Sequence, residues 1–494
     1  MTRERADGRV AGVVPARGHT TGRMRAAIRR GLVVALVGVA ALAGAGCAAQ
    51  AEPAAPATGP VPPELVGDWK GRIEVPGSPL DIGITLTTDG GTFDLPAQGL
   101  ADLPLADLRT GGGTFAAALP DVPGGARFDG TVTGDTISGD FTQGGQKLPF
   151  ALERGTLAPP ARPQEPRPPF PYRSEDVTYP ADGFDLAGTL TTPEGPGPFT
   201  AVVMITGSGP QDRDEALAGH KPFLVIADSL TRAGYAVLRV DDRGVGGSGG
   251  DYAAGRYDDM AADVLAGVSY LAGRPEIDPA RIGLFGHSEG GYLAPLAAER
   301  AAGAVAFVIM MAGPAVDGEA ILARQNELLL AQAGVPQTEI DAQVAYVRQL
   351  AQLLRTGDEE GARELTRTRL TEQLASLPED QRPPAEQVDA QIEASFVEYR
   401  RLVPYDPAPA LSALSVPVLA FYGGADVQVP ADQSEPVLTE LLADNPDATV
   451  RTLPGLNHLM QPSATGAPAE YATIETTVAP EVLDLVTGWL RERF

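Results

Sequence analysis

The sequence contains a single cysteine, Cys47, among its 494 residues. One cysteine cannot build an internal disulfide framework or a cysteine-rich metal site. Histidine is almost as scarce, with four residues, so we expect no histidine-based metal centre. We expect no nucleotide cofactor either, because the glycine-rich stretch 244–249 lacks a helix start and a dinucleotide-binding context.

Positive charge is also in short supply. Lys and Arg number 38 against 64 Asp and Glu, which gives a formal net charge of −26. Beyond the first thirty residues no basic cluster offsets this acidity. Such a surface repels phosphate backbones, so the composition argues against nucleic acid as a partner. Hydrophobic residues make up 43% of the chain, which is enough for globular cores, and the length favours two or three domains.

One hydrophobic run, residues 31–46, lies near the N-terminus and follows Arg25, Arg29 and Arg30. A basic segment followed by an apolar one that ends in small residues is typical of a signal peptide. The run is shorter than the roughly 20 residues that span a bilayer comfortably. We therefore expect residues 1–46 to be a signal peptide, with Met24 as an alternative start, and the protein to be exported.

The small residues 43–46 directly before Cys47 resemble a bacterial lipobox, although Gly44 stands where Leu or Val is usual. This pattern predicts a lipid on Cys47 and an anchor on the outer face of the cell membrane. A plain secretory signal, or an uncleaved anchor, is the alternative. Residues 47–63 are rich in Ala and Pro and lack periodicity, so we interpret them as a tether.

Residues 64–155 alternate apolar and polar side chains between glycine-rich turns, for example in 69–75 and 81–86. This alternation predicts a small antiparallel all-β domain of about seven or eight strands. The segment contains neither histidine nor cysteine, so we expect a structural companion. The proline-rich residues 156–172 are interpreted as a stiff linker.

Residues 173–494 follow a different pattern, in which apolar strand-like runs alternate with helical stretches. Near-continuous apolar runs are what a parallel sheet buried on both faces requires, so we predict a doubly wound, mostly parallel α/β domain. The runs are 201–205, 235–240, 282–285, 305–311 and 416–421. From about 316 to 405 the sequence is instead helical and amphipathic, which predicts a helical lid inserted between two strands.

Ser288 lies in the motif Gly286-His287-Ser288-Glu289-Gly290, between the run 282–285 and a plausible helix. In this strand–turn–helix context the motif presents a nucleophile, because its glycines permit a very tight turn. The motif at 246–250, around Ser248, has the same pattern, but no helix opens directly behind its serine. We therefore predict Ser288 as the nucleophile and interpret Ser248 as part of a loop.

A serine hydroxyl needs a base to take its proton, and histidine is the usual one. His19 lies in the predicted signal peptide, His220 precedes the motif, and His287 adjoins the nucleophile. His458 follows the strand-like run 449–453 near the C-terminus. In α/β folds that carry this strand–turn–helix motif the partners follow in the order serine, acid, histidine, so we predict His458 as the base.

The acid that orients His458 is expected between Ser288 and His458, just past the end of a strand. Asp426 follows the run 416–421 closely, and its carboxylate would fix the imidazole tautomer. Asp406 precedes that run and Asp432 begins a predicted helix, so both are less well placed than Asp426.

The tetrahedral oxyanion of such a reaction needs two aimed N–H donors. We expect them to be the backbone amides of Glu289, directly after the nucleophile, and of Ser208, in the loop 206–210. The charged residues 211–215 that follow this loop leave two interpretations open. They orient the oxyanion loop or contact polar substrate groups, or they form a salt-bridged structural loop.

These motifs make the sequence resemble bacterial α/β-hydrolase esterases of the EstD type, within the serine aminopeptidase-like hydrolases. The resembling stretches are 206–215, 241–246, 286–291, 422–430 and 456–459. The resemblance implies an α/β-hydrolase fold, triad roles for Ser288, Asp426 and His458, and hydrolysis of short-chain carboxylic esters through an acyl-enzyme. The β segment resembles, more loosely, companion domains that precede such hydrolases.

Three alternatives stay open. An aminopeptidase or amidase of the same fold would hold an α-ammonium group with lid carboxylates such as Glu327, Glu339 and Asp341. A thioesterase is less favoured, because an exported protein meets little CoA. A binding lipoprotein with a degenerate fold would lack a triad residue, and all three are present. The expected partner is a small-molecule ester, and the expected membrane contact is the lipid anchor alone.

Overall fold

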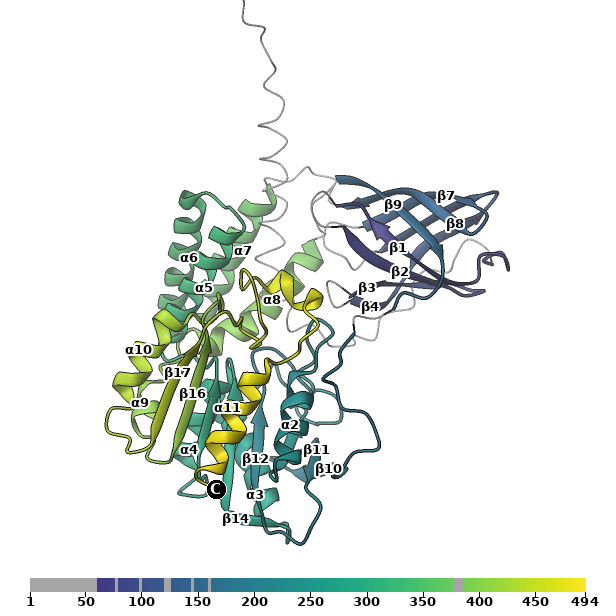
Figure 1. Cartoon of the computed structure of the whole chain (residues 1–494). Coiled ribbons are helices and arrows are strands. Elements are labelled where there is room, and N and C mark those ends of the chain that lie inside the picture. The colour runs from purple at the N-terminus through teal and green to yellow at the C-terminus, as the bar shows by residue number, and fades with distance from the viewer. Residues whose placement is uncertain are drawn as a thin grey trace, which may run out of the picture.

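A computed structural model of the chain describes residues 60–75, 79–96, 100–119, 126–143, 146–158, 161–375 and 385–494. The predicted signal peptide, Cys47 and most of the predicted tether lie outside the described residues. Within the described ranges, no helix combines the length and the apolar character that crossing a membrane requires. The elements form two separate sheets, and helices surround the second one (Figure 1).

The first sheet, in the described part of residues 64–155, has nine antiparallel strands in the order β4-β3-β2-β1-β9-β8-β7-β6-β5. Its strands are β1 (Gly67–Ile73), β2 (Leu80–Leu86), β3 (Gly91–Leu95), β4 (Leu100–Pro104), β5 (Ala106–Gly111), β6 (Thr114–Leu119), β7 (Ala126–Thr133), β8 (Thr136–Gln143) and β9 (Gln146–Arg154). β4 and β5 stand at opposite ends of this order, yet only Leu105 separates them in sequence. The sheet must therefore curl until its two edges approach.

The curled sheet encloses one aromatic core. The ring of Phe128 lies 4.9 Å from that of Phe141, 5.0 Å from Phe150 and 5.6 Å from Phe93, measured between centroids. Alternate side chains of β7 point to this core, which is the period-two pattern that predicted the domain. The all-β domain is confirmed, with more strands than expected, because short segments such as β4 (LADLP) show little alternation.

The second sheet, in the described part of residues 173–494, has eight strands in the order β10-β11-β13-β12-β14-β15-β16-β17. Its strands are β10 (Arg173–Pro180), β11 (Asp185–Thr192), β12 (Phe199–Ile205), β13 (Ala236–Val240), β14 (Ile277–His287), β15 (Val308–Met311), β16 (Val418–Gly423) and β17 (Ala448–Leu453). From β13 to β17 all neighbours are parallel, whereas β10 and β11 are antiparallel to their neighbours. The mostly parallel sheet is confirmed.

Helices cover both faces of this sheet (Figure 1). One face packs on α3 (Tyr257–Ala272), α4 (Gly290–Arg300), α9 (Ala408–Ser412) and α10 (Ala431–Leu441). The other face packs on α2 (Pro222–Arg232) and α11 (Pro480–Arg491). A 3₁₀ helix, η3 (Pro468–Thr473), precedes α11. Functional groups of such doubly wound sheets gather at the carboxyl ends of the strands.

After β15 and before α9 and β16, the described part of the chain has an insertion of four helices: α5 (Gly318–Gln332), α6 (Gln337–Arg355), α7 (Glu359–Ala375) and α8 (Ala385–Leu402). They share a core of their own, which includes Leu322, Leu350 and Phe396. The insertion begins and ends close to the predicted bounds of 316 and 405. Its helices are amphipathic because one face packs on this core while the other stays polar.

The proline-rich linker is fixed to the α/β domain by two side chains. The Arg162 guanidinium donates to main-chain carbonyls of two loops, at Ala218 and Gly219 and at Ala472 and Ile474. Gln164 adds three hydrogen bonds to main-chain groups of residues 477–478. The end of the linker is therefore part of the surface of the α/β domain rather than a free spacer.

Candidate active site

Ser288 lies on the turn between β14 and α4, with a positive φ of 51°. Serine rarely adopts this left-handed conformation, which costs on the order of 1–3 kcal/mol and persists only where the surroundings impose it. Here they do. A Cβ on Gly286 would lie 2.0 Å from the carbonyl oxygen of Gly290, and a Cβ on Gly290 would lie 2.3 Å from that of Ile205. The turn is thus the strand–turn–helix elbow that the motif predicted.

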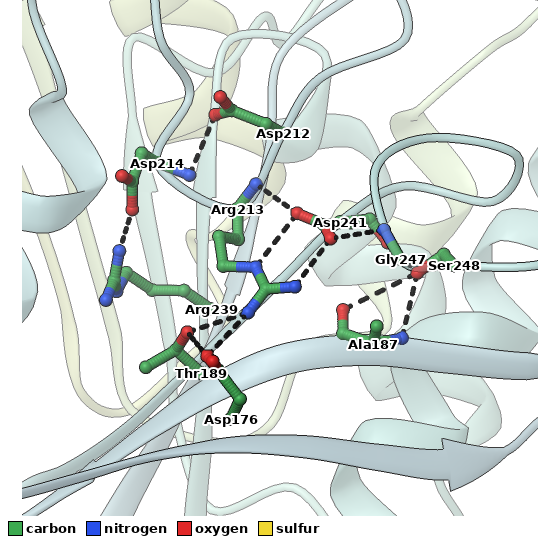
Figure 2. A network of polar contacts seen from close by, with 10 residues as sticks. All are labelled: Asp176, Ala187, Thr189, Asp212, Arg213, Asp214, Arg239, Asp241, Gly247 and Ser248. Atoms are coloured by element: carbon green, nitrogen blue, oxygen red, sulfur yellow. Dashed lines mark hydrogen bonds and ion pairs between the residues drawn. The ribbon is translucent and has the colours of Figure 1, made fainter.

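Ser248, the serine of the second motif, occupies a different environment (Figure 2). Its hydroxyl is largely buried, donates to the carbonyl of Asp241 at 2.7 Å and accepts from the amide of Ala187 at 2.9 Å. A hydroxyl committed to the main chain of β11 and to the main chain after β13 joins two neighbouring strands. The geometry matches the loop interpretation of Ser248.

His458 and Asp426 are brought together from two different strand ends. Asp426 follows β16 and His458 follows β17, and the Nδ1 atom of His458 lies 2.8 Å from Oδ2 of Asp426. The other carboxylate oxygen of Asp426 accepts from the amides of Gln428 and Val429, at 2.8 and 2.9 Å. A carboxylate beside Nδ1 makes that nitrogen the donor, so Nε2 is left as the acceptor.

The two other candidates for the acid beside His458, Asp406 and Asp432, interact with other groups. Asp406 accepts from the amide of Ala408 at the start of α9. Asp432, whose side chain is 71% exposed, pairs with Arg324 of the insertion. Neither contacts a histidine among the described residues.

The Ser288 turn and the His458 loop are in contact through His287. The Nε2 atom of His287 lies 3.1 Å from the carbonyl oxygen of His458, and the two imidazole rings are 4.8 Å apart. No hydrogen bond within the described ranges joins the Ser288 hydroxyl to the His458 ring. Such catalytic contacts often tighten only when substrate binds.

The two expected oxyanion donors are free amides. Neither Ser208 N–H nor Glu289 N–H has a hydrogen-bond partner in the described part of the chain. The amide of Gly207, by contrast, donates to Oε1 of Glu215 at 2.7 Å. A Cβ on Gly207 would lie 3.3 Å from Cβ of Ser288, so this loop runs directly beside the serine. Donors in that position suit an oxyanion.

The charged residues 211–215 are held by protein groups. Arg213 donates to the Asp241 carboxylate from its main chain and its guanidinium, at 2.7–3.0 Å, and also to Asp176 and Thr189 (Figure 2). Burial raises the pKa of Asp241, but the hydrogen bonds from Arg213 and Gly247 outweigh it and the pKa is lowered.

Of the remaining acids of this loop, Asp214 pairs with the buried Arg239, and Asp212 accepts from the amides of Asp214 and Ala216. These ion pairs and hydrogen bonds match the interpretation of residues 211–215 as a salt-bridged structural loop.

Asp242 is a partly buried group that the sequence did not mark as part of the site. Its carboxyl accepts from the hydroxyl of Thr206 at 2.8 Å and from the amide of Gln211 at 2.9 Å. Burial raises the pKa of Asp242 to about 8, so this carboxyl is mostly neutral at pH 7. Through these two hydrogen bonds Asp242 fixes both ends of the loop that contains Ser208. The only sequence feature that could have pointed to Asp242 was its position in the stretch 241–246, which is one of those that carry the family resemblance.

Arg401 is the second residue that sequence reasoning missed. It lies on α8, its side chain is 1% exposed, and its Nε is 3.4 Å from Oε1 of Glu289. The guanidinium stacks over the ring of Tyr252 at 4.3 Å and pairs with Glu398. The inserted helices are thereby joined to the residue directly after Ser288. No local pattern could predict a contact between residues so distant in sequence.

Comparisons with known proteins place the chain near a family of hydrolases. The family model described as serine aminopeptidase, S33, matches residues 221–461, a range that contains Ser288, Asp426 and His458. Esterase EstD of Thermotoga maritima is 29% identical over 320 residues, which are 65% of this chain and 68% of EstD.

Two of the similar solved structures are esterases as well. The Pyrococcus furiosus esterase Pf2001 has a TM-score of 0.40 and 16% identity, over 68% of this chain and 99% of that one. Est1E from Butyrivibrio proteoclasticus has a TM-score of 0.38 and 16% identity, over 64% and 96% of the two chains. The EstD relative and the family model confirm the resemblance of this chain to the esterase EstD and to the serine aminopeptidase-like hydrolases.

Proposed function

We propose that this protein is a serine carboxylesterase that hydrolyses short-chain acyl esters through an acyl-enzyme on Ser288. The observation that carries the proposal is the contact of 2.8 Å between His458 and Asp426, on a loop that touches the Ser288 turn. The similarity to EstD supports ester substrates.

In the proposed reaction, Nε2 of His458 takes the proton of the Ser288 hydroxyl while the serine oxygen attacks the ester carbonyl. Asp426 fixes the ring and stabilises the imidazolium that forms. The free amides of Ser208 and Glu289 bind the oxyanion. His458 then protonates the alcohol, which leaves, and in the second half it activates the water that releases the acid.

We further propose that helices α5 to α8 act as a lid over this site. Arg401 supports that role, because it ties α8 to Glu289, whose amide is one of the two proposed oxyanion donors. A shift of α8 would then displace the Glu289 amide and change the geometry of the proposed oxyanion hole. Export and lipidation of Cys47 also remain proposals. Incorporation of a labelled fatty acid, lost in Cys47→Ala, tests the lipid.

The test of the esterase is turnover of p-nitrophenyl acetate, butyrate and decanoate. Ser288→Ala should lower kcat/KM by several orders of magnitude and abolish labelling by a fluorophosphonate probe, which needs an activated serine. Ser248→Ala is the matched control, and it should stay within about tenfold of the wild type. Near wild-type turnover by Ser288→Ala would overturn the assignment.

An aminopeptidase or amidase is the second candidate, because the matching family is described as serine aminopeptidase. A groove of about 620 Å³ between α5, α6 and α10 contains Glu327 and Asp341. Its carboxylates are largely engaged, since Glu327 pairs with Arg324, and Asp317 and Glu319 pair with Arg355. Paired carboxylates hold an ammonium group poorly, which favours esters. Aminoacyl p-nitroanilides and acyl-CoA assayed beside the esters rank the three activities.

A further inference from the structure

His287 has a hydrogen-bond partner at each of its two ring nitrogens. Its Nδ1 lies 2.8 Å from Oε1 of Glu215, and its Nε2 lies 3.1 Å from the carbonyl oxygen of His458. A carboxylate and a carbonyl are both acceptors, whereas a neutral imidazole carries only one N–H. An imidazolium with both nitrogens protonated satisfies both contacts, with the Glu215 carboxylate as its counter-charge.

The surroundings of His287 favour this charged form. The side chain is buried, and burial lowers its pKa, but the charge and hydrogen bond of Glu215 and the carbonyl of His458 outweigh burial. The more distant Asp426 carboxylate acts in the same direction, and the net effect is a raised pKa. The other titratable ring facing His287 is that of His458, at 4.8 Å.

The pair touches all three segments of the proposed site. Oε1 of Glu215 also accepts the amide of Gly207, at 2.7 Å, which commits that amide and leaves the next one, Ser208 N–H, free. His287 directly precedes Ser288. Its other nitrogen holds the main chain of His458. One buried ion pair thus connects the oxyanion loop, the nucleophile turn and the base.

The pair is poorly suited to a purely stabilising role. Glu215 adopts a positive φ of 51°, which is strained for this residue type. Its Oε2 is buried without a hydrogen-bond partner in the described part of the chain. Buried ion pairs stabilise folds weakly even when they are fully satisfied. The free-energy cost of the strained backbone and of the unpartnered oxygen is consistent with a functional role of the pair in the site.

We propose that Glu215 and His287 are positioning residues, a buried carboxylate–imidazolium pair that sets the oxyanion loop and the His458 loop around Ser288. The inference rests on the proposed esterase for its effect on rate. The charge state of His287 does not depend on that function, so it is tested separately.

The first experiment is ¹⁵N NMR of the full-length, histidine-labelled protein at pH 7. We expect both ring nitrogens of His287 in the protonated state, with His287→Gln used to assign the signal. His220 is the internal reference for a neutral ring, because burial lowers its pKa to about 4. A neutral tautomer at His287 would overturn the proposal, whatever the protein hydrolyses.

The second experiment measures kcat and KM for p-nitrophenyl butyrate in Glu215→Gln, His287→Gln and the double variant. A displaced oxyanion loop should lower kcat by about 10- to 100-fold in each single variant and leave KM within about twofold. Because the two residues act as one unit, the double variant should lose no more than the worse single one. Losses that multiply, or losses confined to KM, would contradict a shared positioning role.

If the variants fold poorly, the NMR signal of the wild-type protein still decides the charge state. If the wild type hydrolyses no ester while both nitrogens of His287 are protonated, the proposed function fails and the ion pair stands. The fluorophosphonate labelling rate of Ser288 then gives the kinetic readout, and we expect it to fall in Glu215→Gln. An unchanged rate would overturn the positioning role.

Discussion

Arg401 of α8 lies 3.4 Å from Glu289, measured from Nε to Oε1, and both side chains are buried. This contact connects the inserted helices to the residue that follows Ser288. Arg401 also covers the ring of Tyr252, so the charge is enclosed on several sides. The insertion is therefore more than an addition to the surface, because its last helix forms an ion pair with the turn that carries Ser288.

Replacing Arg401 by Met should destabilise the protein by about 3–5 kcal/mol, because it leaves the buried Glu289 carboxylate without its counter-charge. We also expect kcat to fall, since the Glu289 amide is a proposed oxyanion donor. Urea denaturation and ester turnover measure the two effects. Arg367→Ala on α7 is the control, because its pairs are exposed and such pairs contribute little. Equal stability of the two variants would refute the coupling.

Asp426→Asn should lower kcat by about 10⁴-fold with little change in fold, because the amide favours the wrong tautomer of His458. The amides of Gln428 and Val429 keep an oxygen acceptor in this variant. The pH profile of kcat/KM and a circular dichroism spectrum are the measurements. Asp432→Asn, at an exposed position, should behave like the wild type, and a comparable loss there would undermine the choice of acid.

His220 should make the protein less stable as the solution becomes acidic. Burial lowers its pKa from 6.5 to about 4, so between these values the unfolded chain binds more protons than the folded one. Stability is thus fully present above about pH 6.5 and declines as pH falls toward 4, by up to about 1.4 kcal/mol per unit. Denaturant melts from pH 4 to 7 should give a flatter profile for His220→Gln than for the wild type. Parallel profiles would contradict the shift.

Asp242 should make the protein less stable as the pH rises, which is the opposite of the effect of His220. Burial raises its pKa from 3.8 to about 8, so the folded protein holds a proton that the unfolded chain releases. Its contribution is present below about pH 4 and is lost as pH rises toward 8. Asp242→Asn mimics the neutral carboxyl, since its oxygen can accept from Gln211 and its nitrogen can donate to the Thr206 hydroxyl. The variant should gain stability over the wild type as pH rises from 4 to 8 in the same melts. A constant difference would show that Asp242 is ionised throughout.

The central strands of the hydrolase sheet were predictable because burial on both faces demands apolar residues. The runs 201–205 and 416–421 correspond closely to β12 and β16. β10 was not predicted, because it lies at an antiparallel edge and its sequence, RSEDVTYP, is mostly exposed. The run 305–311 was too long, since only Val308–Met311 pairs as a strand.

In the site, chain order and strand ends were enough to bring His458 and Asp426 together in the prediction. The partners of Glu215 and Glu289 could not be found in this way. Their contacts, with His287 and Arg401, join segments that are distant in sequence, and neither carries a local pattern. In residues 211–215 the sequence showed the charges but not their partners, and those partners match a salt-bridged structural loop.

The anchored linker limits how far the two folded parts can separate. β9 ends at Arg154, and Arg162 is held by loops 218–219 and 472–474, so the intervening chain reaches at most about 27 Å. The second loop follows Tyr471, whose hydroxyl accepts from Gln428 beside Asp426. The last strand of the curled sheet therefore stays within a tether's length of the loop beside Asp426, however the rest of that domain is oriented.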